Sequence, residues 1–149
     1  MKTTTELGPI FTRVLEEFAF MFAEDLPEGA TPEIPELSSI VSVHFSGDQK
    51  GTVCIAAPQS FCLALYDNMV GLDDGADLDL RVKDAFKELC NVVAGQVITE
   101  CFGSTKRYHL SVPELIDASP DEWQALDHDF GGHWMMVDGQ FVIALVVTL

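Results

Sequence analysis

Lys and Arg are scarce in this chain of 149 residues, which carries 8 of them against 24 Asp and Glu, for a formal net charge of −16. So acidic a chain repels nucleic-acid phosphates and anionic lipid, and the composition therefore argues against nucleic acid and membrane as partners. The same charge would attract a partner that offers Lys, Arg or a bound metal ion.

Long apolar runs and clustered cysteines are also missing. The first residues lack the apolar region of a secretory signal, and the nearby run FAFMFA at 18–23 is far too short to cross a bilayer. The four cysteines form no CxxC pair, and His128 and His133 stand five positions apart, which fits no common metal-ligand spacing. We therefore expect a reduced, cytoplasmic protein without a metal site of its own.

What the chain does have is enough apolar character for a core. With 48% hydrophobic residues, residues 1–149 fit one domain. In the first half of the chain, periodicity and turn residues predict a helix at 10–26 stopped by Pro27, a hairpin at 39–57, and a helix at 58–71 that starts on Pro58 and ends at Gly71. In the second half they predict a helix at 80–102 capped by Asp79 and Gly103, and a strand at 108–116 interrupted by Pro113. An irregular or partly helical segment at 118–133 and a hairpin at 133–149 that turns at Asp138-Gly139 complete the chain.

This order predicts an α+β fold, in which long helices pack on one face of an antiparallel sheet. Each half of the chain begins with a long helix and proceeds to a hairpin, and GDQKGTVCIAA (47–57) loosely resembles VDGQFVIALVV (137–147). The pattern is compatible with an internal pseudo-two-fold repeat or with a chance likeness. The last strand, FVIALVVTL, is almost uniformly apolar, so it is either buried on both faces or part of a dimer interface.

Polar residues line one side of the long predicted helix. Asp84, Glu88 and Asn91 stand at i, i+4 and i+7. At about 100° per residue, and with Asp84 as the reference, Glu88 lies about 40° and Asn91 about −20° around the helix axis. The opposite arc collects Val82, Ala85, Phe86, Leu89, Val92, Val93 and Val97. The helix is therefore predicted to bury one face and to present a narrow polar stripe on the other.

Charge pairing separates the two acids of this stripe. Asp84 has Arg81 at i−3 and Lys87 at i+3, so pairing on the helix surface would explain it. Glu88 has no such partner, and its neighbour at i−4 is the like-charged Asp84. Spacing alone leaves two interpretations of Glu88 and Asn91 open, a solvated face or a functional site.

Gly95 falls on the same stripe. A glycine inside a helix costs about 1 kcal/mol relative to alanine, and the neighbouring Ala94 shows that a small helix former is acceptable nearby. Either another molecule approaches the helix closely here, or the glycine packs tightly within its own fold.

The order D-x3-E-x2-N on a long helix with a later proline resembles the CheC/CheX/FliY chemotaxis phosphatases, the elements here being Asp84, Glu88, Asn91 and Pro113. GTVCIAAPQSFCLALYDNMVG (51–71) resembles the family's glycine-led strand and following helix, and DAFKELCNVVAGQV (84–97) its motif helix with the small Ala-Gly step. The first predicted helix offers only a degraded copy, with Thr12, Glu16 and Ala19 at the corresponding spacing. One intact copy makes the chain most similar to single-site CheX.

The resemblance implies a phosphatase of a phospho-aspartyl, CheY-like response regulator in chemotaxis or two-component signalling. Glu88 would pair with the regulator's active-site lysine, and Asn91 would orient the attacking water. Asp84, Gly95 and Pro113 would contact the partner, whose receiver domain would supply the Mg²⁺, so the chain needs no cofactor of its own. The resemblance also implies a homodimer joined through sheet edges.

Two other functions stay open at this point. A non-catalytic adaptor could bind a response regulator or a flagellar switch component through the same helix. A small-molecule sensing domain would require an enclosed apolar pocket.

Overall fold

The computed structural model describes residues 2–3, 7–27, 29–35, 37–70, 77–103, 107–128 and 133–148. The described strands are β1 (Lys2–Thr3), β2 (Ala23–Asp25), β3 (Ser38–Ser46), β4 (Gly51–Pro58), β5 (His109–Leu110), β6 (Glu114–Ala118), β7 (His133–Val137) and β8 (Gln140–Thr148). The described helices are α1 (Leu7–Ala19), α2 (Gln59–Val70), α3 (Leu78–Phe102) and α4 (Pro120–His128).

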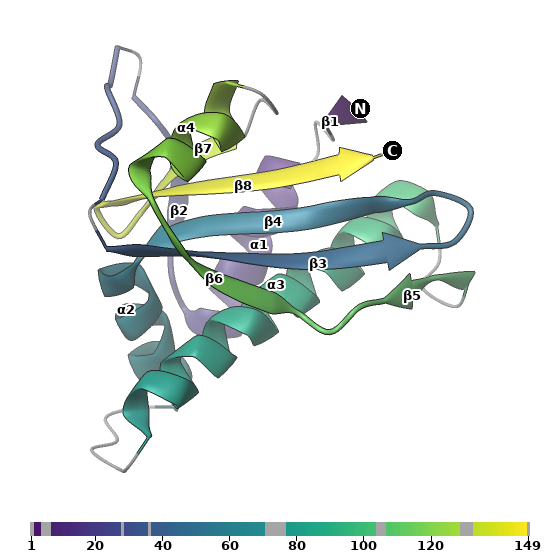
Figure 1. Ribbon diagram of the computed structural model, residues 1–149, viewed down its shortest axis with the longest axis horizontal. Coiled ribbons are helices and arrows are strands. Elements are labelled where there is room, and N and C mark those ends of the chain that lie inside the picture. Colours follow the sequence, from purple (N-terminus) through teal and green to yellow (C-terminus); the bar gives the residue numbers. More distant parts are fainter. Residues whose placement is uncertain are drawn as a thin grey trace.

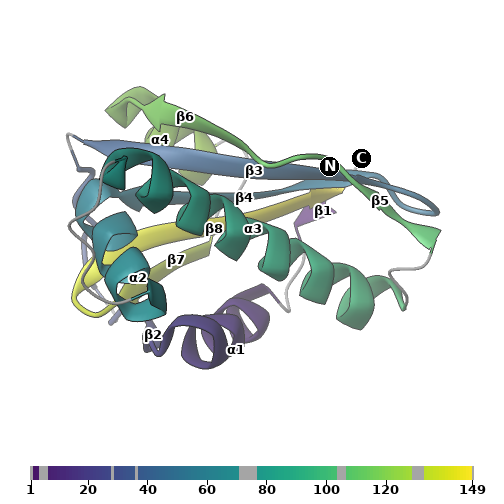
Figure 2. The same cartoon turned by 90° about the horizontal axis from the view of Figure 1, so that it is seen from below.

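All of these strands join one antiparallel sheet in the order β2-β7-β8-β4-β3-β5, with β1 added on β8 and β6 on β3. The helices α1, α2 and α3 cover one face of the sheet, and the short α4 lies on the other (Figures 1 and 2). The predicted α+β class, with long helices packed on one face of an antiparallel sheet, is confirmed.

Strand order is symmetric about the central pair of β4 and β8. The hairpin β3–β4 comes from the first half of the chain and is extended by β6 of the second half. The hairpin β7–β8 comes from the second half and is extended by β2 of the first half. This exchange of edge strands is what an internal two-fold repeat would produce, and the repeat itself stays a prediction.

The strand β8 is buried on both of its faces. Val142 and Val146 belong to the main core under α1, α2 and α3. Ile143 and Leu145 point the other way, into a smaller apolar cluster beneath α4. Burial within the chain therefore accounts for the uninterrupted apolar sequence of this strand. A dimer interface is not needed to explain that sequence, and the homodimer stays a prediction.

Two of the turns and breaks predicted from the sequence are found where expected, and the predicted start of a helix at Pro58 is not. Asp138 and Gly139 have φ values of 48° and 81° and connect β7 to β8 in the predicted two-residue turn. Pro113 separates β5 from β6, as predicted, since it has no N–H to donate to a neighbouring strand. Pro58 is the last residue of β4, so α2 begins one residue after it, while Gly71 lies outside the described residues.

The prediction of a helix over 10–26 is wrong in its second half, because α1 ends at Ala19. Phe20 adopts a left-handed φ of 55°, and the Met21 N–H donates to the Leu15 carbonyl over 3.1 Å, which satisfies a carbonyl at the helix end. Beyond Ala19, buried and exposed side chains alternate toward β2. The apolar run therefore has the period of an extended chain and not that of a helix.

The long helix α3 begins at Leu78, slightly earlier than predicted. Asp77 precedes it with a left-handed φ of 66° and makes no side-chain cap. The sequence predicts Asp79 as the cap of the helix, but Asp79 lies in the first turn. There its carboxylate forms an ion pair with Lys83, with 3.2 Å between Oδ2 and Nζ. Gly103 ends the helix with a φ of 97°, as predicted.

The segment predicted to be irregular contains a helix, α4. Its N-terminus is a capping box: Ser119 Oγ accepts the Glu122 N–H over 3.3 Å, and Glu122 Oε1 accepts the Ser119 N–H over 3.1 Å. Trp123 is fully buried, its Nε1–H donates to Ser38 Oγ over 2.7 Å, and Ser38 Oγ donates to the Ala118 carbonyl. The sequence S-P-D-E is the signal that would have predicted this helix.

Trp123→Ala should lower the free energy of unfolding by about 3–5 kcal/mol, because it leaves a cavity between α4 and the sheet and removes the hydrogen bond that Trp123 donates to Ser38. The variant Gln124→Ala, at the neighbouring exposed position, should change stability by less than about 0.5 kcal/mol. Urea unfolding followed by circular dichroism measures both, and equal midpoints for the two variants would contradict this account of α4.

Candidate functional site

The helix α3 runs along the sheet with one side turned outward. Its buried residues are Val82, Ala85, Phe86, Leu89, Cys90, Val93, Ala94, Val97 and Ile98. Figure 2 shows α1 on one flank of α3 and β6 on the other. An ion pair between Arg13 of α1 and Glu100 of α3 ties the first flank together. The unburied side of α3 is thus a strip between α1 and β6.

The predicted polar stripe lies on this strip. Asp84 and Glu88 are exposed, and Asn91 is half-buried. Within the described part of the chain, none of these three side chains makes a hydrogen bond or an ion pair. The pairing expected for Asp84 with Arg81 or Lys87 is therefore not formed. Two carboxylates and an amide stand side by side with their hydrogen-bonding capacity open to another molecule.

Gly95 faces open space. A Cβ placed on it would have no other atom within 4 Å, apart from the helix backbone around it. Gly51 of β4 shows the contrast, since a Cβ there would overlap the Val147 carbonyl oxygen and the Phe45 ring. Tight packing within its own fold therefore does not explain Gly95.

Pro113 lies on the β6 flank of this strip. It is half-buried in the short link between β5 and β6, the two strands that pair with the same strand, β3. Leu115 of β6 and Lys83 of α3 line one cavity, so the segment that Pro113 begins runs beside α3.

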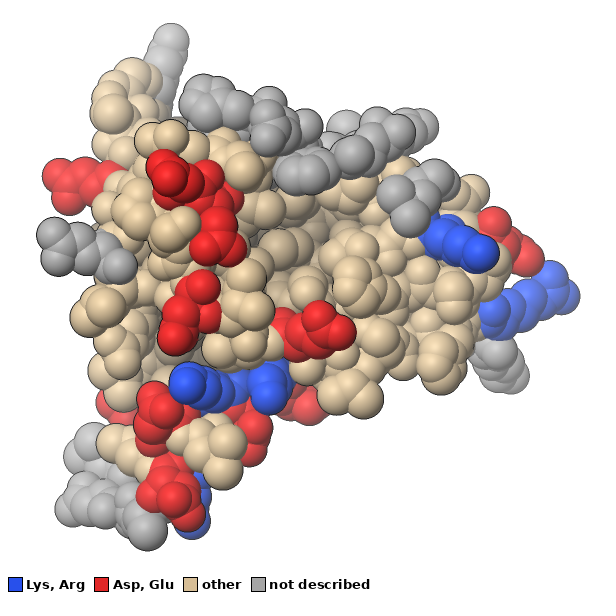
Figure 3. Space-filling view, viewed as in Figure 1, with Lys and Arg blue, Asp and Glu red and all other residues tan. Residues whose placement is uncertain are grey.

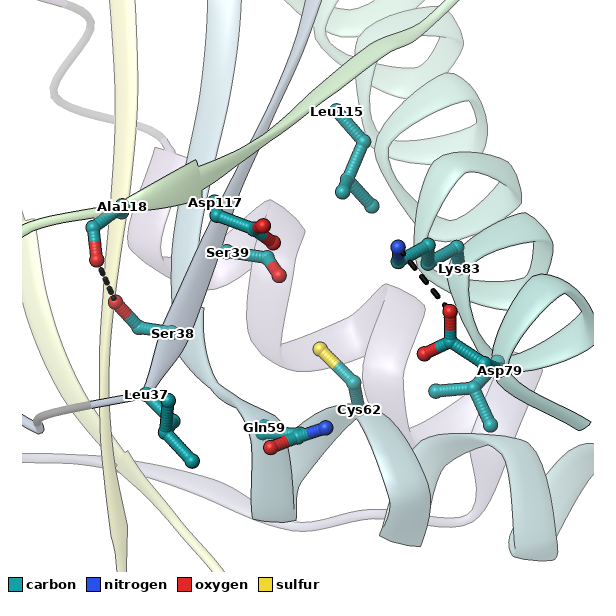
Figure 4. Close-up of a pocket in the computed structure, with 11 residues that line it drawn as sticks. Leu37, Ser38, Ser39, Gln59, Cys62, Asp79, Lys83, Leu115, Asp117 and Ala118 are labelled. Atoms are coloured by element: carbon teal, nitrogen blue, oxygen red, sulfur yellow. Dashed lines mark hydrogen bonds and ion pairs between the residues drawn. The ribbon is translucent and has the colours of Figure 1, made fainter.

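The cavity on that flank has a volume of about 400 Å³ and lies among β3, α2, α3 and β6 (Figure 4). Ser39, Gln59 and Asp117 turn polar groups toward it, and Lys83 reaches in while paired with Asp79. A lining so rich in charged and polar groups differs from the enclosed apolar pocket that a small-molecule sensing domain would require.

The corresponding stripe on α1 cannot act in the same way. Thr12 Oγ1 donates to the Gly8 carbonyl over 2.9 Å, within its own helix. Glu16 is exposed, but Ala19 is fully buried and carries no amide. The described chain thus has one complete acid-and-amide stripe, on α3.

Other chemistries have little support in the described residues. No group of three or more His, Cys, Asp and Glu side chains in that part could hold a metal ion. His133 Nε2 lies 3.2 Å from Asp25 Oδ1, and the His128 side chain is not described. Burial raises the pKa of the Cys54 and Cys62 thiols to about 12 and that of Cys90 well above its ordinary value, which disfavours a thiolate nucleophile.

None of the described helices combines the length and the apolar character needed to cross a bilayer.

Solved structures share this fold over nearly the whole chain. They include the chemotaxis protein CheX from Vibrio vulnificus (TM-score 0.69, 15% identity, 98% of this chain and 95% of that chain). CheX from Desulfovibrio desulfuricans matches with a TM-score of 0.66 and 17% identity, over 97% of this chain and 99% of that chain. The CheX–CheY–BeF3–Mg²⁺ complex from Borrelia burgdorferi matches with a TM-score of 0.65 and 15% identity, over 95% of this chain and 94% of that chain.

This chain thus has the fold of these CheX structures. The family model "Chemotaxis phosphatase CheX" matches residues 39–128, which is more than half of the sequence. The chain belongs to the CheX family of chemotaxis phosphatases. A comparison with curated protein sequences gives no match.

Gly95→Ala should raise the free energy of unfolding of the free protein by about 1 kcal/mol, because alanine favours the helix and the space beside Gly95 is empty. Gly51→Ala should instead destabilise it, since the added methyl overlaps the backbone of β8. Thermal unfolding of the two variants tests this. A Gly95→Ala protein with a lower melting temperature than wild type would contradict the empty space beside Gly95.

Proposed function

We propose that this chain dephosphorylates the aspartyl phosphate of a CheY-like response regulator, with α3 inserted at the regulator's active site. The observation that carries the proposal is the pair of exposed Glu88 and half-buried Asn91 on the outer side of α3, whose side chains make no hydrogen bond or ion pair within the described part of the chain. Membership of the CheX phosphatase family supports it. The complex of a structurally similar CheX with CheY, BeF3 and Mg²⁺ supports a CheY-like partner.

Asn91 positions the nucleophile. Its side-chain amide can both accept and donate hydrogen bonds, so it can hold one water in line with the phosphorus. The water oxygen forms a bond to phosphorus while the bond from phosphorus to the aspartyl oxygen breaks. The carboxylate leaves with the electron pair, and the protons of the water stay on inorganic phosphate or pass to solvent. Catalysis of this step is mainly positioning and electrostatics.

Glu88 anchors the complex. Its unpaired carboxylate meets the lysine that a receiver domain carries beside its phosphorylated aspartate, and a pair desolvated in this way gives specificity. Asp84, one turn away, adds a contact to the same partner. Gly95 lets a loop of the partner lie against the α3 backbone, and Pro113 lies at the border of the contact.

The remaining components come from the partner. The Mg²⁺ belongs to the receiver domain, so the chain uses no cofactor of its own. It acts in the cytoplasm, where response regulators are phosphorylated, and as a homodimer.

The alternative is an adaptor that binds a response regulator or a flagellar switch component without chemistry. Mixing the purified protein with receiver domains phosphorylated by acetyl phosphate, and following phosphate release, separates the two. Binding without faster release would favour the adaptor.

Asn91→Ala should slow the stimulated dephosphorylation about 100-fold or more while leaving binding intact, because one positioning amide is lost. Gln96→Ala removes another amide from an exposed position of the same helix and should leave the rate within twofold of wild type. Stopped-flow release of phosphate gives both rates. A normal rate for Asn91→Ala would exclude the proposed role of this residue.

Glu88→Gln should raise the Kd for a receiver loaded with beryllofluoride about 10-fold or more, because the partner's lysine loses its counter-charge at constant side-chain shape. The rate at subsaturating substrate should fall with it. Asp121→Asn removes one charge from α4 on the opposite face of the sheet and serves as the control. Isothermal titration that gives equal affinities for the two variants would refute the anchoring role.

A further inference from the structure

Like charges are stacked along the surface of α3 in two rows. Asp84 and Glu88 stand at i and i+4, and so do Lys83 and Lys87. A helix surface built for its own stability would place opposite charges at this spacing, since each like-charged pair costs about 0.2–0.5 kcal/mol. The arrangement instead gives the helix an acidic row and a basic row side by side.

Within the basic row, the two lysines differ. The ammonium of Lys83 is held by Asp79 at 3.2 Å and turns toward the cavity on the β6 flank (Figure 4). Lys87 is half-buried and makes no hydrogen bond or ion pair within the described part of the chain. Its neighbour at i+4 is Asn91, so the two Cβ atoms are about 5–6 Å apart. An uncompensated cation thus stands one turn from the proposed water-positioning amide.

Cations are too few in this chain for their placement to be incidental. Of the 8 Lys and Arg residues, Arg81, Lys83 and Lys87 lie in the first half of α3. On the face in Figure 3, Lys and Arg gather where α3 extends beyond β6 and at the end of the sheet near the β3–β4 turn and β5. A net charge of −16 repels the phosphoryl group of a partner, so a cation close to the docked phosphoryl group would offset that repulsion.

We infer that Lys87 is a further catalytic residue of the proposed site and contacts the phosphoryl group of the partner. The inference rests on the proposed function and extends it. Asn91 holds the water in line with the bond that breaks, and the flexible stem of Lys87 brings its ammonium to an equatorial phosphoryl oxygen beside that line. Glu88 meets the partner's lysine, so Glu88 and Lys87 match the cation and the anion of the receiver site.

The ammonium stabilises the charge that spreads over the equatorial oxygens as the phosphorus–oxygen bond breaks. Bond making and breaking are those of the proposed hydrolysis, and Lys87 neither gives up nor gains a proton. Because Lys87 is only half-buried, its effect should be on the order of 10-fold, below the 10³ to 10⁵ of a sequestered arginine finger.

The test measures kcat and KM for dephosphorylation of one receiver by wild type, Lys87→Gln and Lys87→Arg. Lys87→Gln should lower kcat about 10-fold, and Lys87→Arg should restore most of it, because a cation at this place is what matters. Lys83→Gln removes a cation that Asp79 already holds, and Lys50→Gln removes one at the far end of the sheet. Both controls should keep kcat within twofold of wild type, and melting temperatures verify that all variants fold.

Each other outcome overturns the inference in a distinguishable way. If Lys87→Gln keeps its kcat while Asn91→Ala loses it, the proposed function stands and the role of Lys87 is wrong. If only KM rises, and the rise disappears at high salt, Lys87 merely steers the approach of the partner and does not contact the phosphoryl group. If wild type accelerates no receiver, the proposed function and this inference fail together.

Discussion

Burial of one side of α3 against the sheet is the interaction on which the site depends. Phe86, Leu89, Val93 and Val97 are fully buried there, and each contributes roughly 1.5–3 kcal/mol on leaving water. Because burial fixes the rotation of α3 about its axis, helix geometry also fixes the direction of the side chains on its outer side. Asp84, Glu88 and Asn91 must therefore face the strip between α1 and β6. A functional constellation on a packed helix is held more exactly than one on a loop, and the Arg13–Glu100 ion pair restrains the same helix near its other end.

The sequence alone sufficed for features that depend on local periodicity. The 3.6-residue spacing of apolar residues on α3 determined which side is buried, and the Asp138-Gly139 pair determined the last turn. Features that depend on tertiary contacts were less accessible. The run after Ala19 is apolar enough for a helix, but pairing of β2 with β7 draws it into an extended conformation. The sequence does not predict the full length of α4, because its single buried aromatic, Trp123, gives too weak a periodic signal. The capping box at its N-terminus can nevertheless be recognised in the sequence.

The residues of the candidate site also differ in whether the sequence alone identifies them. Glu88 and Asn91 were identifiable because their types and spacing needed no knowledge of neighbouring elements. Spacing assigned Lys87 to Asp84 as an ion-pair partner, and only the structure reveals that the pair is not formed. Whether Gly95 serves packing or approach likewise depended on which atoms surround it, and nothing lies within 4 Å of the place where its Cβ would be.

The costs on α3 are all located on one side of it. Two like-charged i,i+4 pairs cost about 0.2–0.5 kcal/mol each, and the glycine adds about 1 kcal/mol. The buried side of the same helix shows no such conflict. Of the four charged residues in these pairs, only Lys83 is compensated by an ion pair, to Asp79, in the described part of the chain. Local rules that are broken together on one surface are expected at functional sites. A helix that merely needed solvation could have avoided the two like-charged pairs by exchanging Lys87 with Glu88, and the cost of the glycine by replacing Gly95 with alanine. The proposed contact with a second molecule, whose charges run opposite to those of this surface, would account for all of these costs.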